Sequence, residues 1–194
     1  WVEGALSSPL GSGAGQFDNF NTPGNTKIPA FATHLRSAVV DVGGWDEDFI
    51  SCQDSDLSMR MIEQGYQLMR CPETTVSMAK RTSLSRWWKM GHRYGFWRTK
   101  IVIRHPKRIS LREYAPWFGA ILSAILYFAS STYWMIPALM YCTVLIAEAL
   151  RSSIRNRRIS LLVGIPLCLI MLHTSFSIGL LDGFIRKGKE SSDR

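Results

Sequence analysis

The chain has 194 residues, which is enough for one domain and a smaller second part. Its net charge of +8 suits an anionic partner such as nucleic acid, lipid headgroups or a phosphorylated substrate, and does not choose among them. The four cysteines have neither metal-ligand spacing nor a paired framework, which argues against a zinc module and a disulfide-stapled fold. We expect free thiols at Cys52, Cys71, Cys142 and Cys168.

The polar part of the chain, residues 1–114, predicts an α/β or α+β domain. A loop rich in Gly, Ser, Pro and Asn is expected at 8–24. The pattern then predicts a strand at 28–32, a helix at 34–42 closed by Gly43 and Gly44, a helix from Gln53 to Gly65, and strands at 66–71 and 74–78. These strands are too few to close a doubly wound sheet, so we expect the first half of the domain to precede Trp1.

A further helix is predicted at 83–98, and its composition is both basic and rich in aromatic residues. Its aromatic side chains are Trp87, Trp88, Tyr94, Phe96 and Trp97, and its cations are Arg86, Lys89, Arg93 and Arg98. Such a helix can lie in the membrane interface, with its Trp rings at the depth of the lipid headgroups.

Residues 115–184 predict a membrane region. No charged side chain occurs from 115 to 147, a run that is too long for one spanning helix of about 20 residues and just long enough for two. Ser130, Ser131 and Thr132 interrupt the run, which predicts a hairpin of helices at about 115–130 and 133–150. A third uncharged run covers 159–181 and is again long enough to cross.

The charges that flank these runs predict their orientation. The arginine-rich loop at 151–158 and the basic polar part should both lie on the cytoplasmic side. Three crossings would place the basic tail at 185–194 outside, against the same rule, so one segment could instead be re-entrant or interfacial. The third run would be the weakest spanner, because His173, Thr174 and Ser175 lie in its middle. Buried core helices of a soluble protein are the other alternative.

Two motifs of the polar part resemble family 2 glycosyltransferases. They are Gly-Trp-Asp-Glu-Asp-Phe at 44–49 and Gln-Asp-Ser-Asp-Leu at 53–57, followed by Arg60 and Gly65. The stretches at 81–84 and 91–97 and the pair His105-Pro106 are similar to the succinoglycan-type branch of polysaccharide biosynthesis. The resemblance covers about residues 5–184. It implies the acceptor-side, C-terminal half of a GT-A nucleotide-diphospho-sugar transferase domain at 1–114, a membrane region of about three helices at 115–184, and a polar tail at 185–194.

The resemblance also implies roles for individual residues. Asp54 would be the general base that takes the proton of the acceptor hydroxyl, while the nucleotide diphosphate leaves from the opposite side of the anomeric carbon. Substrate contacts would come from Gln53, Asp56, Arg93, Tyr94 and Trp97, with Arg93 on the donor diphosphate and Tyr94 lining the acceptor site.

Two alternatives stay open at these positions. Asp54 or Asp56 can be an ordinary helix N-cap, and residues 83–98 can be an interfacial cationic helix. The chain also departs from the family pattern, which carries Gln and Trp where this sequence has Met90 and Tyr94.

The same resemblance implies the cofactor and the partners. A divalent cation, Mg²⁺ or Mn²⁺, would be held by an Asp-x-Asp motif that precedes this region in the family, so its ligands would not lie in this chain and the chain alone would be inactive. The donor would be a nucleotide-diphospho-sugar and the acceptor a lipid-linked sugar or a glycan, at the cytoplasmic face of the cell membrane. The alternative is a non-enzymatic, membrane-anchored basic domain that binds anionic lipid or a protein partner. Nucleic acid is not expected, because the sequence has membrane runs and no recognition motif.

Overall fold

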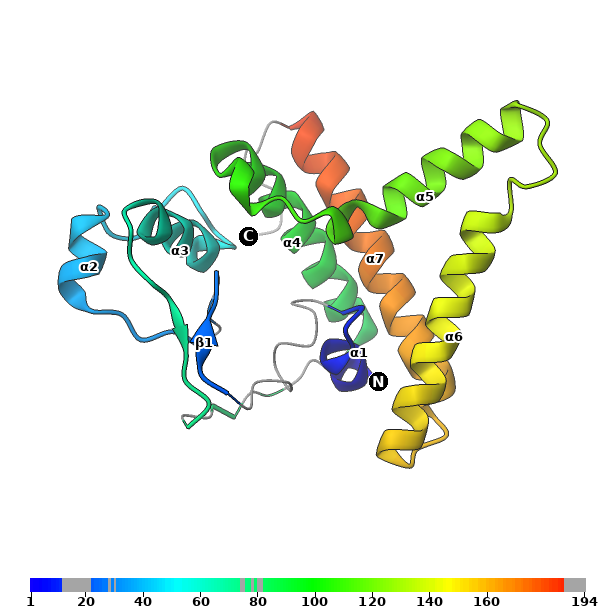
Figure 1. Cartoon of the computed structure of the whole chain (residues 1–194), viewed down its shortest axis with the longest axis horizontal. Coiled ribbons are helices and arrows are strands. Elements are labelled where there is room, and N and C mark those ends of the chain that lie inside the picture. Colours follow the sequence, from blue (N-terminus) through cyan, green and yellow to red (C-terminus); the bar gives the residue numbers. More distant parts are fainter. Residues whose placement is uncertain are drawn as a thin grey trace.

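The computed structural model describes residues 1–11, 22–27, 29, 31–73, 76–77, 79 and 82–186, and these residues are mostly helical (Figure 1). The helices are α1 (Val2–Ser7), α2 (Arg36–Asp41), α3 (Gln53–Glu63), α4 (Leu84–Arg104), α5 (Leu111–Phe128), α6 (Ile136–Asn156) and α7 (Leu161–Ile185), with a 3-10 turn, η2, at Pro106–Arg108. One antiparallel ladder joins β1 (Gly24–Asn25) to β2 (Met69–Arg70).

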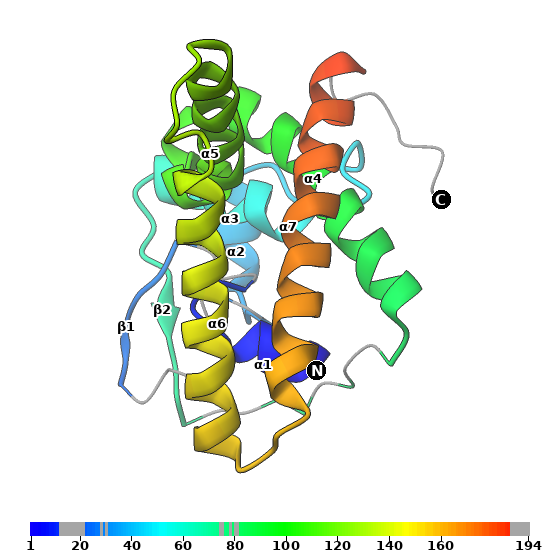
Figure 2. The ribbon, with the colours of Figure 1, turned by 90° about the vertical axis from the view of Figure 1, so that its right-hand side faces the viewer.

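The close packing of α4 against α7 organises the molecule, and the two helices lie side by side in both views (Figures 1 and 2). Glycines let the two backbones approach. A Cβ added to Gly95 would lie 2.1 Å from the carbonyl oxygen of Phe176, and one added to Gly179 would lie 2.0 Å from that of His92. Thr99 adds a hydrogen bond from its hydroxyl to the carbonyl of Leu180, at 3.1 Å. Small residues at a helix interface therefore set the distance between α4 and α7.

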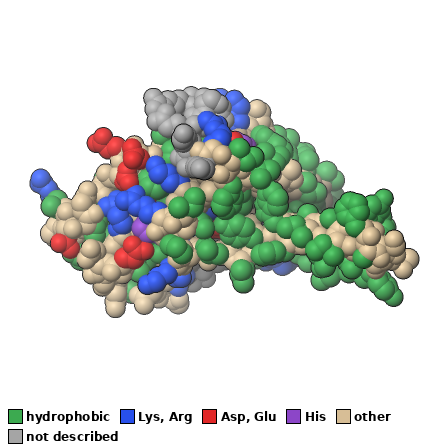
Figure 3. Space-filling model, turned by 90° about the horizontal axis from the view of Figure 1, so that it is seen from above, with side chains coloured by type: hydrophobic (Ala, Val, Ile, Leu, Met, Phe, Trp, Pro, Cys, Tyr) green, Lys and Arg blue, Asp and Glu red, His purple; other side chains and the backbone are tan. Residues whose placement is uncertain are grey.

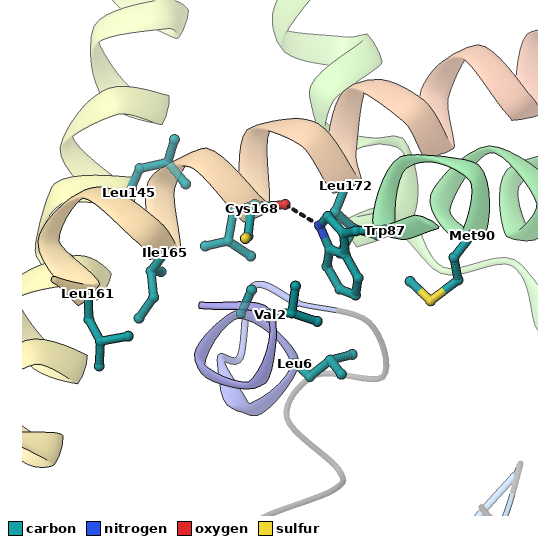
Figure 4. Packing of buried hydrophobic residues seen from close by; sticks show 11 residues of the cluster. Val2, Leu6, Trp87, Met90, Leu145, Leu161, Ile165, Cys168 and Leu172 are labelled. Carbon is teal, nitrogen blue, oxygen red and sulfur yellow. Dashed lines mark hydrogen bonds between the residues drawn. The ribbon is translucent and has the colours of Figure 1, made fainter. Parts of the chain in front are cut away.

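A hydrophobic cluster fills the space where α1 meets α4 and α7 (Figure 4). Trp87 is at its centre, fully buried, and its indole N–H donates to the carbonyl of Cys168 at 2.8 Å. Val2 and Leu6 of α1 cover the cluster from one side. The sequence prediction of Trp rings at headgroup depth is therefore wrong for Trp87 and equally for Trp97, which is 1% exposed, because both rings pack inside the protein.

The predicted membrane hairpin forms α5 and α6, and its turn contains the predicted break at Ser130–Thr132. In α5, all of which is described, no residue is buried. The hairpin extends away from the rest of the molecule (Figure 1), and hydrophobic side chains cover that end of the surface in Figure 3. Phe118, Ile125, Phe128 and Leu139 are among the large apolar side chains exposed there. Monomeric soluble proteins rarely leave so much contiguous apolar surface in water.

In the described part of the chain, one helix, α7, is long and apolar enough to cross a membrane by length and composition. The prediction that this last run is the weakest spanner is therefore wrong. Its polar centre is accommodated by partners, since His173 makes contacts of 2.8 Å to the Tyr141 hydroxyl and 2.9 Å to the carbonyl of Leu10. Helix α6 falls short because Glu148 and Arg151 lie in its second half.

The polar part contains less strand than its sequence predicts. Of the strand expected at 66–71 only Met69–Arg70 forms, and it pairs with Gly24–Asn25 from the region predicted as a loop. Residues 29, 31, 32, 76 and 77 are not in strands, and the rest of the predicted strands at 28–32 and 74–78 lies outside the described residues. Most of the loop predicted at 8–24 and of the tail at 185–194 also lies outside them.

The two short helices of the polar part are confirmed. Helix α2 begins two residues later than predicted and is closed by Gly43 and Gly44, whose φ angles are +83° and +75°. Helix α3 begins at Gln53 as predicted and ends before Gly65, which has a φ of +92°. The N–H of Tyr66 reaches the carbonyl of Met61 at 3.0 Å, the hydrogen bond of a glycine-dependent helix stop.

Two alanine substitutions test the packing of α4 on α7. Gly95→Ala should lower stability by about 1–3 kcal/mol or more, because the new methyl group meets backbone atoms that cannot move alone. Gly119→Ala is the matched control: it lies in α5 with no atom near its added Cβ, and should raise stability by about 0.5–1 kcal/mol through helix propensity. Thermal unfolding of the detergent-purified protein, followed by circular dichroism, measures both. Equal melting temperatures would contradict the close approach of the two helices.

Candidate active site

The acidic turn at 45–49 is anchored on α4 by its last residue. Phe49 is 5% exposed, and its ring lies 5.9 Å from that of Trp97 in α4. Within the turn, the N–H of Asp48 donates to the carboxylate of Asp46 at 2.9 Å. Lys100 holds the same turn from α4, with its Nζ 3.0 Å from the carbonyl of Asp48 and 4.5 Å from the centre of the Phe49 ring. The turn is thus fixed by apolar and cation–π contacts together.

A fully buried carboxylate, Asp56 of α3, joins the polar part to the end of α4. Its Oδ2 accepts a hydrogen bond from Arg60 Nε at 2.8 Å, and its Oδ1 lies 3.2 Å from Arg104 Nη1 and 3.0 Å from His105 Nε2. The other ring nitrogen of His105 lies 2.9 Å from Glu63 Oε1. Burying a carboxylate is tolerated only with partners of this kind.

The same network reaches the residues in front of the acidic turn. Arg60 donates to the carbonyls of Val42 and Gly44, at 2.5 and 2.7 Å, while Arg104 also pairs with Asp46. This pairing with Arg104, aided by the N–H of Asp48, lowers the pKa of Asp46. Arg60 and Arg104 therefore fix the position of the turn relative to α3.

The structure also decides the alternative in which Asp54 or Asp56 is the N-cap residue of the helix. The residue before α3 is Cys52, and no side chain caps the helix. Asp56 binds cations inside the protein, and with no exposed surface it supports the site rather than touching a substrate. Cys52 itself has a φ of +64°, an uncommon backbone conformation for a residue other than glycine, which concentrates strain directly before Gln53 and Asp54.

Gln53 and Asp54 are exposed on the first turn of α3, and Gln53 lies at the edge of a surface hollow of about 360 Å³. The hollow is lined by Trp45, Asp46, Glu47, Phe49 and Gln53. The exposed ring of Trp45 offers an apolar face, while carboxylates and an amide offer hydrogen bonds. Asp54 Oδ1 accepts the N–H of Ser55 at 2.8 Å. The combination suits a polyhydroxylated ligand next to a carboxylate base.

The predicted substrate residues of α4 are divided between two clusters. Trp97 packs with Phe49 beneath the acidic turn, and its burial excludes direct contact with a substrate in this conformation. Tyr94 is half-buried against the Trp87 cluster, on another part of α4. Arg93 is also half-buried, and its Nε has no hydrogen-bond partner among the described residues. Of the predicted site residues, Gln53 therefore lines the hollow, Asp54 follows it on the first turn of α3, and Trp97 packs under the acidic turn against Phe49.

Sequence reasoning missed Lys100, Arg104 and the buried role of His105. One signal was present: Lys100 and Arg104 are four residues apart, so they lie on one face of α4 above an acidic turn of opposite charge. His105 was noted only as part of a family motif. Its two carboxylate partners are 42 and 49 residues away, beyond the reach of any local pattern.

The residues that the structure describes contain no group of three or more His, Cys, Asp or Glu side chains that could hold a metal ion. The segment Asp54-Ser55-Asp56 has the letters of an Asp-x-Asp motif. Its two carboxylates do not fit a shared cation, because both oxygens of the buried Asp56 already contact Arg60, Arg104 and His105.

Comparisons with known proteins point to one kind of chemistry. The chain is 37% identical over 82 residues to a pre-mycofactocin glycosyltransferase of Mycobacterium tuberculosis, found in two strains. The match covers 42% of this chain and 17% of the relative, so the chain spans only a small part of that protein's length. No family model matches, and no solved structure matches. The partial similarity supports a glycosyltransferase, which uses a sugar donor and an acceptor.

Two substitutions on α3 separate the buried carboxylate from the exposed one. Asp56→Asn leaves Arg60 without its carboxylate partner and His105 with Glu63 alone, and should cost about 3 kcal/mol of stability, near the low end for a broken buried ion pair because Arg104 is 41% exposed. Asp54→Asn, two residues away and exposed, should change stability by no more than about 0.5 kcal/mol. Chemical unfolding of the purified variants measures the difference. Asp56→Asn with wild-type stability would show that the network does not hold α3 in place.

Proposed function

We propose that the chain is part of a membrane-bound, inverting family 2 glycosyltransferase of the succinoglycan-like branch, and that residues 1–114 belong to the acceptor side of its GT-A domain. The observation that carries the proposal is the hollow beside Asp54, lined by an exposed Trp and by carboxylates, in a chain whose partial relative is a glycosyltransferase. The buried network around Asp56 gives that hollow a fixed position, as an acceptor site requires.

The proposed reaction needs one base on the acceptor side. The acceptor hydroxyl oxygen attacks the anomeric carbon of a nucleotide-diphospho-sugar, and a new C–O bond forms. The bond from that carbon to the diphosphate breaks, and its electron pair leaves with the diphosphate. Asp54 takes the hydroxyl proton, a contribution of about 10²–10⁴-fold to the rate. Gln53 and Trp45, at the edge of the hollow, would orient the sugar ring that bears the hydroxyl.

Two further parts of the proposal concern the donor. Arg93, half-buried on α4, would contact the diphosphate through its planar guanidinium group. The divalent cation expected for the family would neutralise the same diphosphate, through ligands outside the described residues.

The apolar helices would hold this site at the membrane. Helix α7 would span, and the exposed apolar surface of α5 and α6 would face lipid rather than water. The basic loop at 151–158, which precedes α7, would then lie on the cytoplasmic side.

Removing the base tests the mechanism. In the full-length protein, Asp54→Asn should lower turnover by about 10²-fold or more while fold and donor binding stay unchanged. Asp48→Asn is the control, because Asp48 is exposed in the neighbouring turn and takes part through its backbone. Transfer of radiolabelled sugar from nucleotide donors is the assay. Normal turnover of Asp54→Asn would remove Asp54 from the mechanism.

Cysteine labelling tests the membrane arrangement. In a variant without the four native cysteines, Thr132→Cys at the α5–α6 turn and Arg155→Cys near the end of α6 place single thiols at exposed positions. A membrane-impermeant maleimide should reach residue 132 from outside intact cells and residue 155 only after permeabilisation. Labelling of both residues from one side would contradict the hairpin.

A further inference from the structure

Two partly buried arginines share a single carboxylate where α4, η2 and α5 meet. Arg98 lies in α4, Arg108 in η2 and Glu113 in the first turn of α5, and their side chains are 13, 17 and 15% exposed. Arg98 Nε is 3.2 Å from Glu113 Oε2, and Arg108 Nη1 is 3.6 Å from Glu113 Oε1. One negative charge therefore faces two positive charges in a poorly solvated place.

The three groups are close but badly matched for hydrogen bonding. Among the residues that the structure describes, Arg98 Nε and Nη1, Arg108 Nε and Glu113 Oε2 are buried atoms without a hydrogen-bond partner. Buried donors of this kind are rare in proteins, because a charged group that has left water without a hydrogen-bond partner is destabilising. A phosphate group has more acceptor oxygens than a carboxylate, and it can meet two planar guanidinium groups with paired hydrogen bonds.

The surrounding charges also favour an anion. Burial lowers the pKa of Arg108, and the positive charges of Arg98 and Arg112 lower it further, so a second anion beside Glu113 would relieve the repulsion. The cluster adjoins the start of α3. Burial raises the pKa of the Cys52 thiol, on which Arg98, Asp54 and Arg108 all act electrostatically. Asp54 follows Cys52 by two residues in the chain, so the charges of the arginine pair and of the candidate base act on the same side chain.

Exposed apolar side chains beside the pair decide between a soluble and a membrane-borne phosphate. Ile109 is 50% exposed and Leu111 is 74% exposed, directly after Arg108, and they begin the apolar surface of α5. A soluble nucleotide has no aliphatic chain to cover these side chains, whereas the first carbons of a lipid chain can remove them from water.

We propose that Arg98 and Arg108 form a binding site for the phosphate of a phosphorylated membrane lipid, whose apolar chain lies along Ile109, Leu111 and α5. The proposal rests on the glycosyl transfer proposed above and names its acceptor class: a sugar linked to lipid through phosphate, with the phosphate on the arginines and the sugar hydroxyl at Asp54. Glu113 occupies the anion position while the lipid is absent.

Direct binding tests the site without any sugar donor. The purified protein in detergent is titrated by calorimetry with farnesyl phosphate, farnesol, inorganic phosphate and uridine diphosphate. Farnesyl phosphate should bind at least about tenfold more tightly than any of the other three, because it alone combines the charge with the apolar chain. Arg98→Ala and Arg108→Ala should each weaken its binding about tenfold or more, as expected for one lost charged hydrogen bond.

A variant that is expected to bind more tightly separates a ligand role of the arginines from simple damage to the fold. Glu113→Gln removes the competing negative charge and should tighten farnesyl phosphate binding several-fold, which a merely destabilised protein would not do. Lys107→Ala is the matched control: it removes the exposed cation next to Arg108 in η2 and should change affinity less than about twofold.

Two results would overturn the proposal. One is equal affinity for farnesol and farnesyl phosphate, which would leave the arginines without a ligand role. The other is preferred binding of uridine diphosphate with the same dependence on Arg98 and Arg108, which would assign the pair to a soluble nucleotide. Because no sugar is transferred in this experiment, either result would leave the proposed role of Asp54 standing or falling on its own assay.

Discussion

Helix α4 is the element on which both halves of the molecule depend. Its central glycines let it approach the backbone of α7, and its last turn supplies Arg104 and leads into His105, which bind the buried Asp56 of α3. A rigid helix therefore connects the most apolar helix of the chain to the acidic turn and the candidate base. Any displacement of α4 would move the candidate site relative to the apolar helices. The polar and apolar parts are therefore mechanically coupled through α4.

The buried ion network is a means of positioning more than a source of stability. Taking Asp56 out of water costs several kcal/mol, and its pairing with Arg60, Arg104 and His105 compensates for that cost. The network fixes the position of the acidic turn relative to α3. Arg60 also binds the carbonyls of Val42 and Gly44, and Arg104 also binds the carboxylate of Asp46. An acceptor hydroxyl must be placed within hydrogen-bond reach of its base, and a fixed turn beside α3 meets that requirement.

Local signals predicted the local features correctly. The glycines at 43, 44 and 65 marked two helix ends, Gln53 began α3, and Ser130–Thr132 marked the hairpin turn. Strands were over-predicted at 66–71, because strand formation depends on a neighbouring partner and a two-residue partner is all that β1 offers. Trp87 and Trp97 were misplaced because an aromatic helix face looks the same in sequence whether it packs on protein or on lipid. The Asp56 network could not be read from the sequence, since its partners are brought together only by the packing of α4.

In the proposed reaction, a hydroxyl held beside Asp54 attacks a nucleotide-activated sugar from the side opposite the diphosphate. The most direct measurement is the anomeric configuration of the first product, determined by NMR with the full-length protein, a set of nucleotide-diphospho-sugars and a phosphate-linked lipid sugar as acceptor. The account predicts a new glycosidic bond whose configuration is opposite to that of the donor. A product with retained configuration would contradict it, because retention requires a second displacement that a single acceptor-side base does not provide.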